Sequence, residues 1–368
     1  MFRSTLRRLL GAAFAIAVVV CTTHVAAQSE YGFRVNQFRL APSGSDGFTT
    51  LSAADQGHLR FGTAFSIDYN RRGLSERLSP VPENTAVSAP YPKQDVVNDE
   101  ISSTFLLSIG IFDRIILFGG LTFDFMMQGA SAANLLVPTA DGGGVGDVQL
   151  GGRFRLVGDA GDFFQLAFQG VITVPLGEKI DSSQTYTGDH SATGIPELIF
   201  EFNTDRMRFL LNTGFRLRQI QEFGGLDIGH DWLWSAAALY PVIDDRLELI
   251  GELNGSTRLR QFFGKQQTPV EVSVGARYSF GPGLYIGGGL GAGLTKSVGS
   301  PAVRVFAMVG FTQQETDLEE IDETLSEEET SSDEGEDVAD DVDVEEENAD
   351  SDSVDSEGDT DDESSDEL

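Results

Sequence analysis

The stretch from Ile195 to Arg218 constrains the fold more than any other part of the chain. Large apolar side chains occupy every second position in two successive runs, and mainly Glu, Asn and Arg lie between them. Because successive side chains of a β-strand point to opposite faces, each run predicts a strand with one apolar and one charged face. A turn at residues 204–206 joins the runs, so the stretch predicts an antiparallel hairpin. The apolar set is Leu198, Phe200, Phe202, Phe209, Leu211, Phe215 and Leu217.

The same alternation recurs from His58 onward, and short connections between the predicted strands alternate strictly with long ones. A two-sheet sandwich has no reason for that regularity, whereas outer-membrane barrels combine short periplasmic turns with longer external loops. The sequence therefore predicts an all-β fold, a transmembrane antiparallel up-and-down β-barrel of about 12 strands over residues 58–312. The expected strands are 58–70, 100–111, 114–127, 146–157, 162–174, 194–203, 207–218, 231–241, 247–256, 269–280, 284–294 and 302–312.

The ends of the chain predict segments outside the barrel. Arginines near the N-terminus precede an apolar run and a small-residue cleavage sequence, which predicts a signal peptide over residues 1–27. Residues 28–57 form a lead-in segment, for which a periplasmic position and a position inside the lumen both remain open. Residues 313–368 are rich in Asp, Glu and Ser and contain no Lys or Arg, which predicts a disordered polyacidic tail.

Charge and cysteine usage exclude several classes of function. The formal net charge of −33 is concentrated in the acidic tail, so the predicted barrel is nearly neutral and lacks the basic surface of a nucleic-acid-binding protein. The single cysteine, Cys21, falls within the predicted signal peptide. We therefore expect neither disulfides nor thiol chemistry in the mature chain. No catalytic set, cofactor site or metal site is expected either.

Charged side chains on the polar face are expected to line the lumen, because the apolar face of a membrane barrel meets lipid. Neighbouring strands are about 4.8 Å apart, so charges of opposite sign can pair across the inner wall and fill it. Long charged side chains in a barrel of about 12 strands favour a filled lumen of low conductance with little ion selectivity. The candidate lumen-lining residues are Arg60, Asp68, Arg153, Arg155, Glu197, Glu201, Arg208, Arg216, Arg218, Glu248, Glu252, Glu271, Arg277 and Arg304.

This interior predicts a structural barrel or a narrow, weakly selective pore in the bacterial outer membrane, with both chain ends in the periplasm. The expected partners are outer-membrane lipid, small solutes or ions in the lumen, and divalent cations or basic periplasmic proteins at the acidic tail. One alternative is a transporter for small hydrophobic compounds, although the inward positions look too charged for an apolar path. Another is an outer-membrane enzyme that uses His58, His190 or His230, the last two beside aspartates.

Short stretches between residues 30 and 312 carry a family resemblance. They are His58–Gly62, Phe112–Arg114, Gly144–Arg153, Thr187–Asp189, Val274–Arg277 and Gly293–Thr295. In these stretches the chain resembles the N-terminal β-barrel of OmpA-family outer-membrane proteins of the myxobacterial and delta-proteobacterial type. That family often continues into an Asp-rich calcium-binding linker and a peptidoglycan-binding domain. Here the tail has paired aspartates without glycine-spaced calcium loops, and no such domain follows, so the resemblance does not imply cell-wall anchoring.

Overall fold

The computed structural model describes most of the predicted barrel and part of the lead-in segment. The described residues are 33–77, 93–129, 140–176, 186–189, 191–223, 226–243, 246–264, 267–281 and 283–313. The predicted signal peptide, the acidic tail beyond Gln313 and His190 lie outside these ranges, so what was predicted for them stays a prediction. Among the described residues there is no helix long and apolar enough to cross a bilayer.

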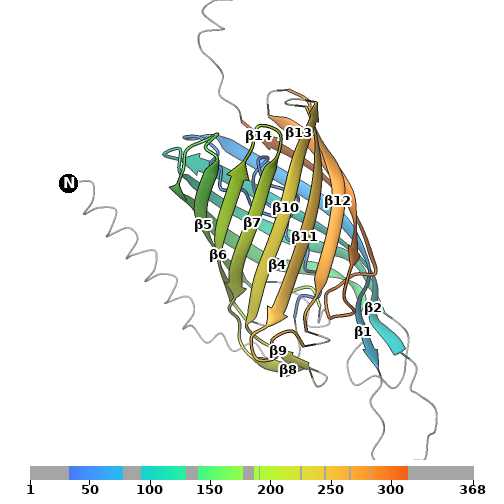
Figure 1. The fold of residues 1–368 in the computed structure, drawn as a ribbon. Helices are drawn as coiled ribbons and strands as arrows, with labels where there is room; N and C mark the ends of the chain where they lie inside the picture. The colour runs from blue at the N-terminus through green and yellow to red at the C-terminus, as the bar shows by residue number, and fades with distance from the viewer. Residues whose placement is uncertain are drawn as a thin grey trace, which may run out of the picture. The chain divides into compact units, whose positions relative to one another are not determined.

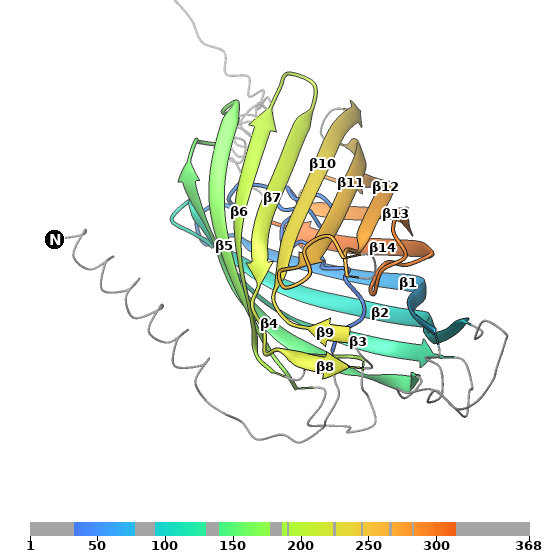
Figure 2. The ribbon, with the colours of Figure 1, turned by 60° about the horizontal axis from the view of Figure 1, so that its bottom comes forward.

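Twelve strands form a closed antiparallel barrel (Figures 1 and 2). They are β1 (Phe61–Arg77), β2 (Lys93–Ile111), β3 (Ile115–Gln128), β4 (Asp141–Val157), β5 (Phe164–Val174), β6 (Thr193–Asn203), β7 (Arg208–Arg216), β10 (Asp231–Ile243), β11 (Leu247–Arg258), β12 (Val270–Ser279), β13 (Leu284–Gly293) and β14 (Val303–Thr312). Each strand pairs with its neighbours in chain order, and β1 closes the sheet against β14, with Gly62 opposite Thr312. The predicted all-β up-and-down barrel is confirmed.

Two short strands were not predicted. They are β8 (Gln221–Phe223) and β9 (Leu226–Ile228), which form a separate hairpin in the connection between β7 and β10. Three residues per strand are too few for a period of two to stand out in the sequence. β1 and β2 are also longer than predicted, because their pairing continues past a bulge at Arg71–Leu74 as far as Arg77 and Lys93.

The short connections lie at one rim of the barrel and the long connections at the other. In the turn between β2 and β3, Phe112 and Asp113 have positive φ angles of 56° and 52°. Tight hairpin turns need this left-handed conformation, because it matches the twist of the flanking strands. β1 begins and β14 ends at the same rim, since Gly62 lies opposite Thr312.

The outward face of the wall is apolar along most of its strands. Water-soluble proteins rarely expose a continuous apolar surface of this extent, whereas lipid-facing barrel strands present one. The face therefore suits a hydrocarbon surrounding. Its exposed large side chains include Phe65, Ile67, Phe105, Leu107, Leu117, Leu150, Phe154, Phe168, Leu198, Phe209, Leu211, Phe215, Leu249, Val274, Ile286, Val305 and Val309.

Residues 33–57, which we call the plug segment, run through the inside of the barrel (Figure 2). At the rim with the long connections, Phe33 packs in one cluster with Leu74 and Val96. At the rim with the short turns, Gly57 lies against Gly110 near the end of β2. Of the two positions left open for the lead-in segment, the described residues take the one inside the lumen.

The described chain starts and ends at opposite rims. Phe33 lies among the long connections, whereas the backbone N–H of Gln313 donates to the carbonyl of Phe61 at the rim with the short turns. The predicted position of both chain ends in the periplasm concerns residues outside the described ranges, so it stays a prediction. A segment that traverses the lumen before β1 adds one more crossing of the barrel.

Apolar side chains of the plug segment pack on apolar side chains that point inward from the wall. The rings of Phe38 and Phe48 lie 5.2 Å and 4.8 Å from the ring of Phe306, centroid to centroid. Each buried large apolar side chain contributes roughly 1.5–3 kcal/mol. The wall residues of this cluster, the inner apolar patch, are Ala64, Leu106, Leu210, Ala237, Leu239, Ile250, Tyr285, Phe306 and Met308, and they contact Phe38, Leu40 and Phe48.

A glycine in the wall makes room for this packing. A Cβ added to Gly275 would lie 2.8 Å from the ring of Phe48 and 2.2 Å from the carbonyl oxygen of Gly288. Any side chain there would push Phe48 and the neighbouring strand away. The expectation that the inward positions are too charged for an apolar path was wrong, because the inner apolar patch lies among them.

Candidate functional site

The plug segment is fastened to the wall most tightly through Asp46. This carboxylate is completely buried and accepts from Nη1 and Nη2 of Arg153 on β4, at 2.7 and 3.0 Å. It also accepts from the backbone N–H groups of Ser43 and Ser52. Arg153, which is 1% exposed, donates further to the carbonyl of Ser52 and to Gln169. All charged atoms of the pair are therefore matched inside the barrel, as buried ions require.

Wall carboxylates also hold the backbone of the plug segment. Glu252 on β11 accepts from the N–H groups of Phe48, Thr49 and Thr50, at distances from 2.8 to 3.2 Å. Glu201 on β6 accepts from the hydroxyl of Ser52 and the N–H of Ala53, at 2.6 and 2.8 Å. These bonds satisfy backbone donors that have no strand partner, which would otherwise be costly inside the barrel.

Asn212 on β7 holds the same stretch from another side. Its amide oxygen accepts from the N–H of Leu51, and its amide nitrogen donates to the carbonyl of the same residue. The pair copies the two hydrogen bonds that a neighbouring strand would make. Residues 48–53 are therefore fixed mainly through their backbone.

Nearer the rim with the long connections, two ion networks fasten the plug segment. Arg39 forms a bidentate pair with Glu197 on β6, at 3.1 and 2.6 Å. Arg304 on β14 donates to Asp68 on β1 at 2.6 Å and to Asn36 of the plug segment at 3.0 Å. Bidentate arginine–carboxylate pairs are strong and directional.

The other candidate lumen-lining residues divide into two groups. Arg155 pairs with Asp55 of the plug segment at 2.9 Å, and Arg208, Arg216 and Arg277 donate to plug-segment oxygens as well. In the second group, Arg218, Glu248 and Glu271 pair with residues of the wall or its connections. Arg60 belongs to this group too and lies beside Gly57 just before β1.

Pairing across the wall occurs at several places, such as Glu248 with Arg208 at 3.0 Å and with Arg277 at 2.5 Å. Glu201 and Arg208 approach to 3.7 Å, as expected for facing strands. Glu197 pairs with Arg39 of the plug segment instead of Arg216. The charged interior is thus matched both within the wall and against the plug segment.

Several residues of this site were not among the predicted ones. Arg39 and Asp46 lie in a segment without periodicity, so no sequence signal marked them. Glu100 and Asp231 are buried and sit in predicted strands, in phase with the inward-facing Ser102 and Leu233. The alternation could have identified these two.

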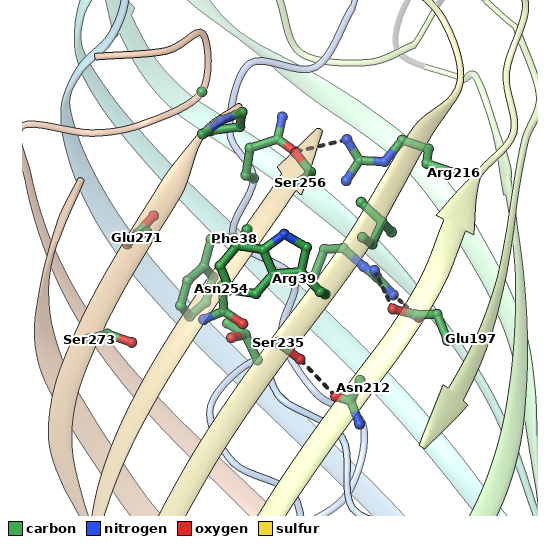
Figure 3. A pocket seen from close by; sticks show the side chains of 17 residues that line it. Phe38, Arg39, Glu197, Asn212, Arg216, Ser235, Asn254, Ser256, Glu271 and Ser273 are labelled. Atoms are coloured by element: carbon green, nitrogen blue, oxygen red, sulfur yellow. Dashed lines mark hydrogen bonds and ion pairs between the residues drawn. The ribbon is translucent and has the colours of Figure 1, made fainter. Parts of the chain in front are cut away.

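A cavity of about 90 Å³ lies between the plug segment and the wall (Figure 3). In Figure 3, Arg39 and Glu197 point toward each other, and Arg216 lies near one end of the cavity. A buried water needs about 10–15 Å³ by this measure, so the cavity has room for several waters or a small solute. Its lining combines hydroxyls and amides with apolar groups from Phe38, Leu233 and Trp234.

A second cavity of about 60 Å³ lies next to the first. Its lining includes Arg34, Leu40 and Asp147. Phe38, Arg39 and Arg216 line both cavities, so they form the partition between them. One short piece of the plug segment and one wall arginine therefore separate these two spaces.

An ion pair closes the rim with the long connections. Burial raises the pKa of Asp189, but the guanidinium groups of Arg218 and Arg216 outweigh burial and hold this pKa below its usual range. Arg218 Nη1 donates to Asp189 at 2.9 Å. The pair therefore stabilises the folded state above the unfolded carboxyl pKa of about 3.9 and stops doing so only as the pH falls through the lower folded value.

We expect this rim to keep its structure from pH 7 to pH 5 and to loosen only below about pH 4. The measurement is amide hydrogen exchange at Thr193 and Arg218, corrected for the intrinsic pH dependence of exchange. Asp189→Asn should show the loosened rim at every pH, whereas Asp205→Asn, in an exposed turn, should not. Loosening of the wild-type rim between pH 7 and pH 5 would contradict the assignment.

The two described histidines take part in backbone contacts. Nδ1 of His58 accepts from the N–H of Phe112 at 3.0 Å, and the two rings stack. Nδ1 of His230 accepts from the N–H of Arg218 at 3.3 Å. An imidazole nitrogen that accepts from the backbone cannot at the same time take a proton from a nucleophile.

Comparison with known proteins begins with a family match. The chain matches, over residues 97–304, the family described as "Putative MetA-pathway of phenol degradation". The match covers the wall from β2 to the start of β14 and leaves out the plug segment and β1. No curated protein matches the chain.

Among solved structures, an outer membrane channel from Pseudomonas putida F1 is similar at a TM-score of 0.53 and 12% identity, covering 71% of this chain and 98% of that one. At this identity the likeness shows the fold alone, which is that of an outer-membrane β-barrel. A NanC porin and the CymD monoaromatic hydrocarbon channel, each at 8% identity, cover 68% and 76% of this chain and 100% and 99% of theirs. Their TM-scores of 0.42 and 0.39 are too low to carry an argument.

These findings correct the resemblance to OmpA-family proteins, which was wrong. That resemblance depended on short, glycine-rich strand and turn stretches, which barrels of many families share because the strand pattern is degenerate. The family match, in contrast, extends from residue 97 to residue 304. Since this match covers more than half of the chain, the chain belongs to the family described as "Putative MetA-pathway of phenol degradation".

Proposed function

We propose that this protein is a bacterial outer-membrane channel for small aromatic and other largely apolar molecules, held closed by the plug segment. The inner apolar patch is the observation that carries this proposal. A pore for ions and sugars has a polar inner wall, because its solutes and their water need polar partners. Here Leu106, Leu210, Ile250 and Phe306 point inward and pack in one buried cluster with Phe38, Leu40 and Phe48 of the plug segment.

The outward face and the family support the same conclusion. The exposed apolar side chains of the wall fit a lipid surrounding, so no further layer of protein is needed to cover them. The family description links the chain to phenol degradation, which requires that aromatic molecules enter the cell. When the plug segment moves, an apolar surface becomes available inside the barrel, where such a molecule can replace the side chains of the plug segment.

Locking the plug segment to the wall tests this proposal. Thr50 and Asn254 are in side-chain contact at 3.4 Å, so cysteines at both positions can be joined by a short thiol cross-linker. We expect cells that express the double-cysteine protein to take up dilute labelled phenol faster than cells without it. Cross-linking should abolish the gain, because the inner apolar patch then stays covered.

The single variant Thr50→Cys, treated with the same reagent, is the matched control and should keep its uptake. Intact cells are needed because their outer leaflet is the barrier that a channel overcomes. Uptake that is the same with and without the protein would refute the channel. It would leave a purely structural barrel, whose loss weakens the envelope instead.

A further inference from the structure

Arg216 on β7 is a deeply buried arginine that keeps most of its hydrogen-bond donors unused. Its side chain is 10% exposed, and Nη1 donates to Gln37 Oε1 at 2.8 Å. Within the described ranges, Nε and Nη2 donate to no protein acceptor. Arg153 and Arg304, by comparison, each donate from three nitrogens. A guanidinium carries five N–H donors, so Arg216 has donors left for a ligand.

The nearest carboxylate does not neutralise Arg216. Nη1 of Arg216 lies 3.8 Å from Oδ2 of Asp231, which is close to the longest distance that still counts as an ion pair. Asp231 already pairs with Arg218 at 2.9 Å and with Arg258 at 3.0 Å. One carboxylate is thus shared by three guanidinium groups, which leaves Arg216 with a positive charge that is poorly matched. A buried charge of this kind is stabilised by an added anion.

Three of the four other carboxylates that line the two cavities are held by other arginines. Glu197 is held by Arg39, and Glu271 is held by Arg304 at 2.7 Å. Asp189 is held by Arg218. One oxygen of Asp147 accepts from the N–H of Asp189 at 3.0 Å, and its other oxygen has no hydrogen-bond partner within the described ranges.

Apolar groups lie close to the unused donors. Phe38, Leu233 and Trp234 line the first cavity together with Arg216, and Phe38 and Arg216 line the second cavity as well. Neither cavity alone, at about 90 and about 60 Å³, reaches the roughly 150 Å³ that accommodates a benzene ring. Movement of the Phe38 side chain out of the partition joins them into a space of that size.

The geometry points to a binding site for a small aromatic carboxylate, whose carboxylate binds Arg216 and whose ring takes the space opened by Phe38. The inference rests on the proposed function and narrows its solute class, since a neutral aromatic molecule leaves the charge of Arg216 unmatched. A carboxylate accepts two parallel N–H bonds from one guanidinium, which fixes its orientation.

Equilibrium binding to the purified full-length protein in detergent tests the site. The probes are benzoate, the neutral benzyl alcohol, and acetate, which has the charge without the ring. We expect benzoate to bind and each of the other two to bind at least tenfold more weakly. Arg216→Gln should weaken benzoate binding by about tenfold to a hundredfold, the loss expected for charge-assisted hydrogen bonds. Arg216→Lys should fall between, since it keeps the charge and loses the planar fork.

The matched control is Arg114→Gln, which removes the same charge from an exposed turn at the other rim and should bind benzoate like the wild type. The shift of the protein band on boiling reports whether each variant is folded. If Arg216→Gln does not fold, the wild-type comparison of benzoate with benzyl alcohol still decides. Equal binding of these two probes, acetate binding as tight as benzoate, or unchanged binding in folded Arg216→Gln would overturn the site. The binding assay needs no transport, so a failed site and a failed channel give different results.

Discussion

Replacing the plug segment, residues 33–57, with a Gly/Ser chain of equal length is expected to convert a nearly closed barrel into a conducting one. In planar bilayers the single-channel conductance should rise several-fold, because the side chains that fill the lumen are gone while the wall is unchanged. Among the buried charged residues of the wall strands, acidic ones outnumber basic ones, so the open lumen should prefer cations. The wild-type protein should show low conductance under the same conditions.

A smaller change separates the effect of the plug segment from damage to the wall. Phe38→Ser, Leu40→Ser and Phe48→Ser together remove the contacts with the inner apolar patch and keep the ion pairs. We expect brief openings in this variant and sustained openings in the full replacement. The control variant Thr49→Ser keeps the side-chain hydroxyl and should conduct like the wild type. If the full replacement stayed closed, something other than the plug segment would fill the lumen.

Arg153→Met is expected to destabilise the seated plug segment by about 3–5 kcal/mol, the cost of leaving one member of a buried ion pair unmatched. The unmatched group would be Asp46, which is completely buried. The wall can keep its closed ladder of hydrogen bonds, so the loss should appear as release of the plug segment. Hydrogen exchange of residues 43–53 should accelerate strongly, while exchange in β11 and β12 should change little.

The double variant Arg153→Met with Asp46→Asn provides the matched test. It removes both charges, so much of the lost protection should return, and the coupling between the two positions should be several kcal/mol. Purely additive effects would show that the pair does not hold the plug segment. Unchanged exchange of residues 43–53 in Arg153→Met would lead to the same conclusion.

The wall could be predicted because the alternation of apolar and polar side chains is visible within each strand's own sequence. A strand places side chains on alternate faces, so Leu198 and Glu197 already reveal two environments from neighbouring positions. Every strand of the barrel was identified in this way, and the alternation of short and long connections then specified its order. Glu100 and Asp231 obey the same rule.

The plug segment could not be predicted, because its contacts leave no pattern in its own sequence. Glu252 binds three successive backbone N–H groups, and almost any residue type supplies those. The partners of Asp46 and Arg39 lie more than a hundred positions away. The inner apolar patch was overlooked for a related reason: Leu106 shares a face with Ser102 and Ser108, and only three-dimensional structure shows that the plug segment covers it.

The lengthwise course of the plug segment restricts how the lumen can open. β1 and β14 close the wall into a ring around a chain that enters near one rim and leaves near the other, and Gly62 opposite Thr312 completes that ring. A segment that the closed wall surrounds in this way cannot leave the barrel sideways while the wall stays closed. Withdrawal by sliding along the barrel axis and local rearrangement within the bore are the motions left to it. While the seam between β1 and β14 stays closed, a passage can therefore open only along the axis.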